Sequence, residues 1–432
     1  MNKYKKLIMI AGIIASSITL VVFFLIGCLF FARPAESQSE NRVLTKFPTF
    51  TWESFISGEY TSQIGLWYSD TFPTREGMIK ANDGIHNLFG IKSDERAESD
   101  GDADELDEGK TMKPTDSNEI EIELDANEGA GGDVIEGFYC VGDTAYELYY
   151  FNENNSKAYV NLIKTAKSKL GKGVNVYDMI VPLAYEFGLG SDVIADLGAS
   201  DCSTAIDYMY SGFKDSGVIT VDICSNMMKH KNEYMYFRTD HHWTATGAYY
   251  AYESFCKTAN IAATPLSSYE KLKFDGFLGT LYNHTKNQNL KNNPDFVEAY
   301  VPQGTNSIKV TDKSGATTNY SIVNKATDKW YPAAGAKYNC FIAGDNPVSE
   351  IHNTKKTDGS TIVVVKESFG NAFIPFLVDS YEYVYVIDYR YFSGTLADFV
   401  KEVGAKDVLF INNVIATSAG ARLNELKKLI GA

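Results

Sequence analysis

The sequence of 432 residues has few basic side chains and few cysteines, and each shortage argues against one class of protein. It has 40 Lys and Arg residues against 55 Asp and Glu residues, a net charge of −15. Nucleic-acid binding needs clustered basic side chains that neutralise phosphates, so this balance argues against it. The six cysteines include no Cys-x-x-Cys spacing. A chain of this length buries an ample core without disulfides, which argues against a disulfide scaffold and leaves only one incidental bridge open.

The apolar fraction of 44% is that of a globular protein, which excludes wholesale disorder, a collagen-like chain and a multi-span transporter. Residues 7–32 nevertheless form one uncharged run that is long enough to cross a bilayer as a helix. Three lysines precede this run, so residues 1–6 are predicted to be cytoplasmic and the rest of the chain extracytoplasmic. A cleaved signal peptide or a lipoprotein signal ending at Cys28 are the alternatives. An uncleaved anchor is favoured, because the apolar run continues past Cys28 and exceeds the usual signal-peptide core of about 7–15 residues.

Three stretches follow the predicted anchor. Residues 33–92 predict an amino-terminal arm with two amphipathic helices, near 52–68 and 75–90. Residues 93–133 predict a disordered acidic linker, because 94–133 alone hold sixteen acidic and three basic residues, a local net charge of −13 that leaves only −2 for the rest. Residues 134–432 predict the main domain, with an insertion containing a hairpin at 300–360.

The main domain alternates β-branched apolar runs with helical patterns. The predicted strands are 174–182, 361–365, 382–387 and 407–412. The predicted helices are 156–170, 244–258 and 395–403. Continuous apolar strands that alternate with helices are typical of strands buried on both faces. The fold class is therefore predicted to be α/β, with a mostly parallel sheet flanked by helices.

A carboxylate and two of the six histidines stand together in Asp240-His241-His242-Trp243-Thr244, just before a predicted helix for which Thr244 is a plausible N-cap. A carboxylate two residues from an imidazole can accept its Nδ1–H and stabilise the imidazolium, as the acid of a serine triad does. An ordinary surface or capping histidine is the alternative. The three side chains could also bind a metal, but no second cluster of ligands is evident, so no metal and no cofactor are predicted.

A serine follows the apolar strand candidate 361–365 in Lys366-Glu367-Ser368-Phe369-Gly370-Asn371, and a helical pattern comes next. A serine on a sharp strand-to-helix turn exposes its hydroxyl at the carboxyl edge of the sheet, where main-chain N–H groups can form an oxyanion hole. The alternative is a serine that only caps the helix.

These two motifs, with Glu40-Asn41-Arg42, Phe47-Pro48 and the segment 70–75, resemble the DHHW protein family. That family is similar to the alginate O-acetyltransferases, whose catalytic domain is SGNH-hydrolase-like. The resemblance implies a triad of Ser368 as nucleophile, His242 as base and Asp240 as the acid that orients it. Lys366-Glu367-Ser368 departs from the Gly-Asp-Ser that is usual in SGNH enzymes. No motif places the oxyanion-hole residues of those enzymes in this sequence, and Asn371 and Asn412 are guesses for that role.

The resemblance implies an extracytoplasmic O-acetyltransferase that acts on a cell-surface or secreted polysaccharide and is anchored by a single membrane span. Because acetyl-CoA is cytoplasmic, it also implies a multi-span membrane-bound O-acyltransferase as the partner that passes the acetyl group across. Two alternatives stay open from the sequence. One is a carbohydrate acetyl esterase that uses the same residues, and the other is a non-catalytic scaffold of polysaccharide export.

Overall fold

The computed structural model describes residues 132–135 and 137–432, with Glu36–Ser37, Arg42–Val43, 46–52 and single positions between 55 and 72 before them. The chain divides into two compact units, 1–95 and 96–432. In the described part no helix is long and apolar enough to cross a membrane. The predicted anchor at 7–32 and nearly all of the predicted acidic linker lie outside the described residues, so both stay predictions.

The smaller unit contains one short antiparallel pair, β1 (Glu36–Ser37) and β2 (Arg42–Val43). Helical positions follow, and they fall within the first helix that the sequence predicts in the arm; they are Trp52, Phe55, Tyr60, Ile64, Trp67 and Tyr68.

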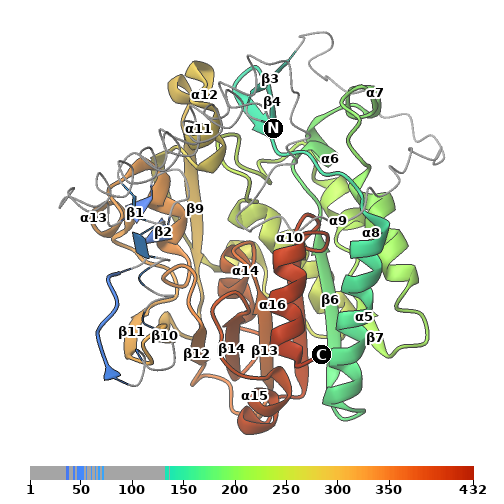
Figure 1. Cartoon of the computed structure of the whole chain (residues 1–432), viewed down its shortest axis with the longest axis vertical. Coiled ribbons are helices and arrows are strands. Elements are labelled where there is room, and N and C mark those ends of the chain that lie inside the picture. Colours follow the sequence, from blue (N-terminus) through green and yellow to red (C-terminus); the bar gives the residue numbers. More distant parts are fainter. Residues whose placement is uncertain are drawn as a thin grey trace, which may run out of the picture. The chain divides into compact units, whose positions relative to one another are not determined.

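The larger unit is built around a sheet of eight strands (Figure 1). In spatial order these are β11 (Thr317–Ser321), β10 (Ser307–Thr311), β12 (Val348–His352), β14 (Tyr383–Asp388), β13 (Thr361–Lys366), β15 (Asp407–Asn413), β6 (Asn175–Val181) and β7 (Val218–Thr220). The five strands from β14 to β7 are parallel, and β12, β10 and β11 continue the sheet in antiparallel fashion.

The α/β class is therefore right, but the sheet is mixed rather than mostly parallel. All four predicted strands lie in its parallel part, where both faces are covered and the sequence is continuously apolar. The hairpin predicted within 300–360 is present as β10 and β11, yet it extends the main sheet. Every side chain of β11 is exposed, so its polar sequence gave no sign of a shared sheet.

Helices cover both faces of this sheet. One face carries α5 (Glu153–Leu170), α8 (Cys202–Ser211), α15 (Leu396–Val403) and α16 (Gly420–Ile430), of which α5 and α16 lie in front in Figure 1. The other face carries α9 (Cys224–Lys229), α10 (Ala245–Ala259) and α14 (Gly370–Leu377). Side chains of β13 alternate between the two cores, with Val363 and Val365 in the first and Ile362 and Val364 in the second.

Smaller elements surround this three-layer core. The strands are β3 (Asp133–Ile135), β4 (Phe138–Val141) and β5 (Thr144–Tyr146) in one small sheet, and β8 (Glu270–Phe277) with β9 (Asp295–Val301) in an antiparallel ribbon. The short helices are α6 (Tyr185–Gly188), α7 (Ser191–Asp196), α11 (Thr280–Thr285), α12 (Gln288–Asn292), α13 (Thr327–Trp330) and the 3-10 turns η1 (Leu266–Ser268) and η2 (Ala334–Cys340). The cysteines at 202, 224, 256 and 340 are free thiols.

A buried polar network lies within the parallel part of the sheet. Tyr159 on α5 donates to Asp178 Oδ1 at 2.6 Å and receives a hydrogen bond from Asn412 Nδ2 at 3.2 Å. Asp178 is fully buried, and its Oδ2 has no hydrogen-bond partner among the described residues. Burial raises the pKa of Asp178 to about 7, although the bond from Tyr159 acts in the opposite direction.

This carboxyl should make the fold less stable as the pH rises. An aspartate in an unfolded chain has a pKa of about 4, so between roughly pH 4 and 7 the folded protein holds a proton that the unfolded chain has lost. Stability attributable to Asp178 is therefore present below this window and is lost on going up through it, by an amount on the order of 2–4 kcal/mol. Asp178→Asn should lose less stability between pH 5 and pH 8 in thermal unfolding than the parent chain does. The exposed Asp196→Asn is the control, and equal pH dependence in all three proteins would contradict this assignment.

Candidate active site

The loop that carries Asp240 and His242 is fixed by a buried carboxylate. Asp295, on β9, is 1% exposed and accepts hydrogen bonds from the main-chain N–H groups of Arg238 (3.0 Å) and Thr239 (2.7 Å) and from Thr239 Oγ1 (2.7 Å). At the other end of the loop, Thr244 caps α10 by accepting from the N–H of Gly247, as the sequence predicted. The motif is thus held at both ends by contacts that do not involve the side chains of Asp240 and His242.

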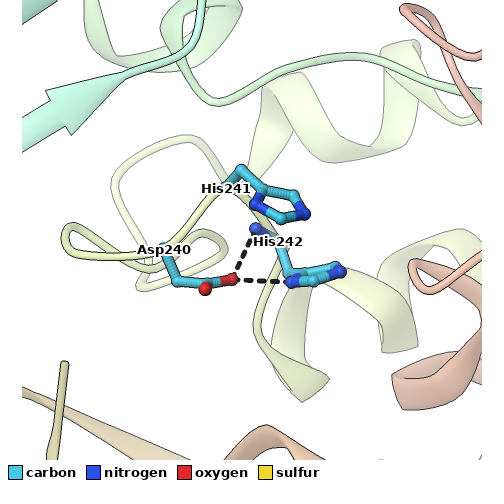
Figure 2. Close-up of side chains that lie close together, drawn as sticks. All are labelled: Asp240, His241 and His242. Carbon is cyan, nitrogen blue, oxygen red and sulfur yellow. Dashed lines mark hydrogen bonds and ion pairs between the residues drawn. The ribbon is translucent and has the colours of Figure 1, made fainter. Parts of the chain in front are cut away.

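Asp240 contacts His242 directly (Figure 2). Its Oδ1 lies 2.6 Å from His242 Nδ1 and accepts the main-chain N–H of His242 at 3.0 Å. Its Oδ2 accepts the N–H and the hydroxyl of Thr280, at the start of α11, at 2.8 and 3.0 Å. Gly279 leaves room for this, because a Cβ there would lie 2.2 Å from Asp240 Oδ2.

Ser368 follows β13 by two residues and precedes α14. The N-cap residue of α14 is Phe369, and no side chain caps it, so the alternative that Ser368 caps the helix is wrong. Its Oγ lies 2.8 Å from His242 Nε2, across 126 positions of sequence. The three residues singled out from the sequence are thus brought together in one hydrogen-bonded chain.

The hydrogen bonds of this chain select the tautomer of His242 that carries its proton on Nδ1, so that Nε2 is the nitrogen that can accept a proton. Burial alone would raise the pKa of Asp240, but His242, His241 and the hydrogen bonds from His242 and Thr280 together hold it well below its ordinary value. An ionised Asp240 accepts Nδ1–H of His242, which leaves Nε2 without a proton and facing Ser368. Such an arrangement can remove the serine proton as Oγ attacks an electrophilic carbon.

Aromatic rings enclose His242, which is only 7% exposed. Tyr338, on η2, stacks on the imidazole with ring centroids 4.2 Å apart, and its hydroxyl donates to the main-chain oxygen of Ser368 at 3.1 Å. Trp243 Nε1 donates to the main-chain oxygen of Phe369 at 2.8 Å. Both contacts tie the histidine loop to the serine turn independently of the side chains that would do chemistry.

His241 points to a different partner. Its Nδ1 lies 2.6 Å from Thr280 Oγ1, and burial followed by the neighbouring His242 lowers its pKa. Asp240, His241 and His242 are close enough to hold a metal ion, since their ligand atoms lie within 4.8 Å of one another. Both oxygens of Asp240 are already engaged by N–H and O–H donors, so a metal would have to replace those bonds.

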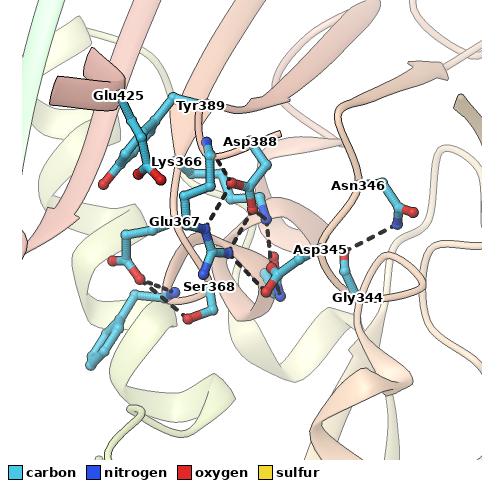
Figure 3. A network of polar contacts seen from close by, with 12 residues as sticks. Gly344, Asp345, Asn346, Lys366, Glu367, Ser368, Asp388, Tyr389 and Glu425 are labelled. Carbon is cyan, nitrogen blue, oxygen red and sulfur yellow. Dashed lines mark hydrogen bonds and ion pairs between the residues drawn. The ribbon is translucent and has the colours of Figure 1, made fainter. Parts of the chain in front are cut away.

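A cluster of four buried or half-buried charges braces the strand before Ser368 (Figure 3). Lys366 Nζ lies 2.9 Å from Asp345 Oδ1 and 2.8 Å from Asp388 Oδ2, and Arg390 pairs with the same two carboxylates. Asn371 Nδ2 donates to Asp345 at 2.9 Å. The cluster is electrically balanced and fixes the end of β13 against the end of β14.

The two guesses for an oxyanion hole find no support in their contacts. Asn371 is engaged with Asp345, and Asn412 is buried between Tyr389 and Tyr159, which contact its Oδ1 and Nδ2 at 2.8 and 3.2 Å. Sequence reasoning missed Thr280, Tyr338 and Glu367, which contact Asp240, His242 and Ser368 respectively. Of these three residues, only Glu367 could have been singled out from the sequence, because it lies next to Ser368.

Comparison with known proteins agrees with the motifs. The family model described as DHHW protein matches residues 40–127 and 109–387. A solved DHHW family protein from Eubacterium siraeum is 30% identical, with 68% of this chain and 96% of that chain covered and a TM-score of 0.62. Bacillus cereus PatB1, solved with a sulfonyl adduct, is 18% identical, with coverage of 66% and 97% and a TM-score of 0.54, which shows a shared fold. No curated protein matches the sequence.

Gly279 should be required for the position of Asp240. A methyl group at this residue would overlap Asp240, and overpacking of this kind costs about 1–3 kcal/mol. Gly279→Ala should lower the melting temperature and slow the labelling of Ser368 by a sulfonyl fluoride, read by intact mass. Gly173→Ala is the matched control, because a Cβ there meets nothing within 4 Å. Equal labelling rates in both variants would show that Asp240 does not need this space.

Proposed function

The chain belongs to the DHHW protein family, and we propose that it is a serine acyltransferase that places acetyl groups on hydroxyls of a cell-surface or secreted polysaccharide. The observation that carries the proposal is the continuous chain Asp240–His242–Ser368, with contacts of 2.6 and 2.8 Å. The acetyl group and the polysaccharide are taken from the resemblance of the family to the alginate O-acetyltransferases.

In the first half of the reaction Ser368 Oγ would attack the carbonyl carbon of an acetyl donor. Its proton passes to His242 Nε2, and the ionised Asp240 stabilises the imidazolium through Nδ1–H. When the bond between the acyl carbon and the donor breaks, the imidazolium gives its proton to the leaving group. The product is an acetyl ester of Ser368.

In the second half a sugar hydroxyl would attack this ester. His242 takes the hydroxyl proton, the bond from the acyl carbon to Ser368 Oγ breaks, and the proton returns to Oγ. We further propose that residues 7–32 anchor the chain in the cell membrane with the active site outside. A multi-span membrane-bound O-acyltransferase would then supply the acetyl group, because acetyl-CoA is on the cytoplasmic side.

The first test separates Ser368 and His242 from His241. With p-nitrophenyl acetate as donor, Ser368→Ala and His242→Ala should each lower turnover by roughly a thousandfold, and the double variant should be no worse, since the residues act as a unit. His241→Ala should retain more activity than His242→Ala, because the Nε2 that faces Ser368 belongs to His242. Full activity of Ser368→Ala would refute the serine mechanism and leave a non-catalytic scaffold as the leading function.

The second readout distinguishes transfer from hydrolysis. Oligosaccharides are added to the same reaction, and acetylated sugar is measured by mass spectrometry beside free acetate. Transfer predicts acetylated sugar at the expense of acetate, whereas an esterase releases acetate at the same rate with and without acceptor. The Ser368→Ala protein is the blank for both products.

A further inference from the structure

The Glu367 side chain occupies a place beside the nucleophile that a reaction would need. Its Oε2 lies 3.2 Å from Ser368 Oγ and accepts the main-chain N–H of Phe369 at 3.1 Å (Figure 3). Its Oε1 accepts the main-chain N–H of Asn413 at 3.0 Å. Glu367 is 4% exposed, so this carboxyl is held inside the turn rather than in solvent.

Donors for a developing oxyanion must lie beside the nucleophile. On strand-to-helix turns the N–H of the residue after the nucleophile is one such donor, and here that residue is Phe369. Asn413 ends β15, the strand that pairs with β13, so its N–H reaches the same edge of the sheet. The two N–H groups point at the two oxygens of one carboxyl, Phe369 at Oε2 and Asn413 at Oε1. A substrate oxygen at the position of Oε2 would meet the same Phe369 donor and the same Ser368 Oγ.

We propose that the N–H groups of Phe369 and Asn413 bind the acyl carbonyl oxygen, and that the Glu367 carboxyl fills this place at rest and leaves it when an acyl donor enters. The inference rests on the proposed function, because it takes Ser368 as the nucleophile. It makes the resting site self-blocked by a carboxylate that imitates the charge of the oxyanion.

The contact with Ser368 adds a second effect. The serine hydroxyl has one proton and two acceptors, His242 Nε2 at 2.8 Å and Glu367 Oε2 at 3.2 Å. When Glu367 leaves, His242 Nε2 is the acceptor that remains for the Ser368 hydroxyl proton. Attack by Ser368 Oγ requires this arrangement, because His242 has to remove that proton. Burial raises the pKa of Glu367, so enclosing this charge costs free energy that movement toward solvent would recover.

A local brace is the competing explanation, since a side chain that accepts the N–H two residues later also stabilises a turn. The two explanations predict opposite responses when the carboxyl is removed. Loss of a blocking group opens the donor pair to substrates and to small anions. Loss of a brace disorders the turn, and a small carboxylate from solution should then repair it.

The experiment uses the full-length chain in mild detergent and labels Ser368 with phenylmethanesulfonyl fluoride, with the rate read by intact mass. Glu367→Ala should be labelled roughly tenfold faster than the parent chain, because the reagent no longer has to displace two main-chain hydrogen bonds. Sodium acetate at constant ionic strength should slow labelling of Glu367→Ala and leave the parent chain unaffected. Glu350→Ala, which removes a partly exposed carboxyl on β12, is the control for removal of a carboxyl and should behave as the parent chain.

Glu367→Gln covers the case in which the alanine variant folds poorly. The amide offers only one acceptor oxygen, so this variant should be labelled at an intermediate rate and should also be slowed by acetate. Slower labelling of either variant with rescue by acetate would overturn the inference in favour of a brace. An unchanged rate without any effect of acetate would overturn it as well. Absence of Ser368 labelling in every protein, the parent included, would instead refute the nucleophile and the proposed function with it.

Discussion

The hydrogen bond between Ser368 Oγ and His242 Nε2 joins two residues that are 126 positions apart in the sequence. It therefore depends on the contacts that position the two segments within the domain. The serine turn is set by β13 and by the charges around Lys366. The histidine loop is set by Asp295, which lies on neither segment. The bond from Trp243 to the main chain of Phe369 then locks the two together. The 2.8 Å distance between Ser368 Oγ and His242 Nε2 thus depends on these separate contacts. None of them is made by the side chains of the proposed triad.

Buried charge explains why these supports are so polar. A buried ion is tolerated only where other groups replace the water it has lost. Asp240 has an imidazole and the donors of Thr280, and Lys366 has two carboxylates. Glu367 is held by main-chain N–H groups without an ion pair among the described residues. Glu367 therefore lacks the directly paired opposite charge that Lys366 has, which is consistent with a side chain that moves.

The sequence was informative wherever a local pattern determines the structure. Continuous apolar runs predicted the four strands of the parallel part, and residue type with position singled out Asp240, His242 and Ser368. Contacts made by ordinary residues from distant elements left no pattern. Thr280 is an unremarked threonine 40 positions after Asp240, and Tyr338 lies in a 3-10 turn. The mixed character of the sheet was missed for a related reason, because β12, the strand that joins the predicted hairpin to β14 in antiparallel fashion, was not predicted.

Enclosure of His242 constrains the order of the proposed reaction. Tyr338 lies on the imidazole at 4.2 Å and the His241 and Phe369 rings lie at 3.9 and 4.9 Å, which leaves the base 7% exposed. Its Nε2 faces Ser368, the partly exposed member of the chain. A donor and an acceptor would both have to approach Nε2 over the same serine oxygen. Two substrates that need one position bind in succession, so the geometry favours an acyl-enzyme that releases the first product before the acceptor enters.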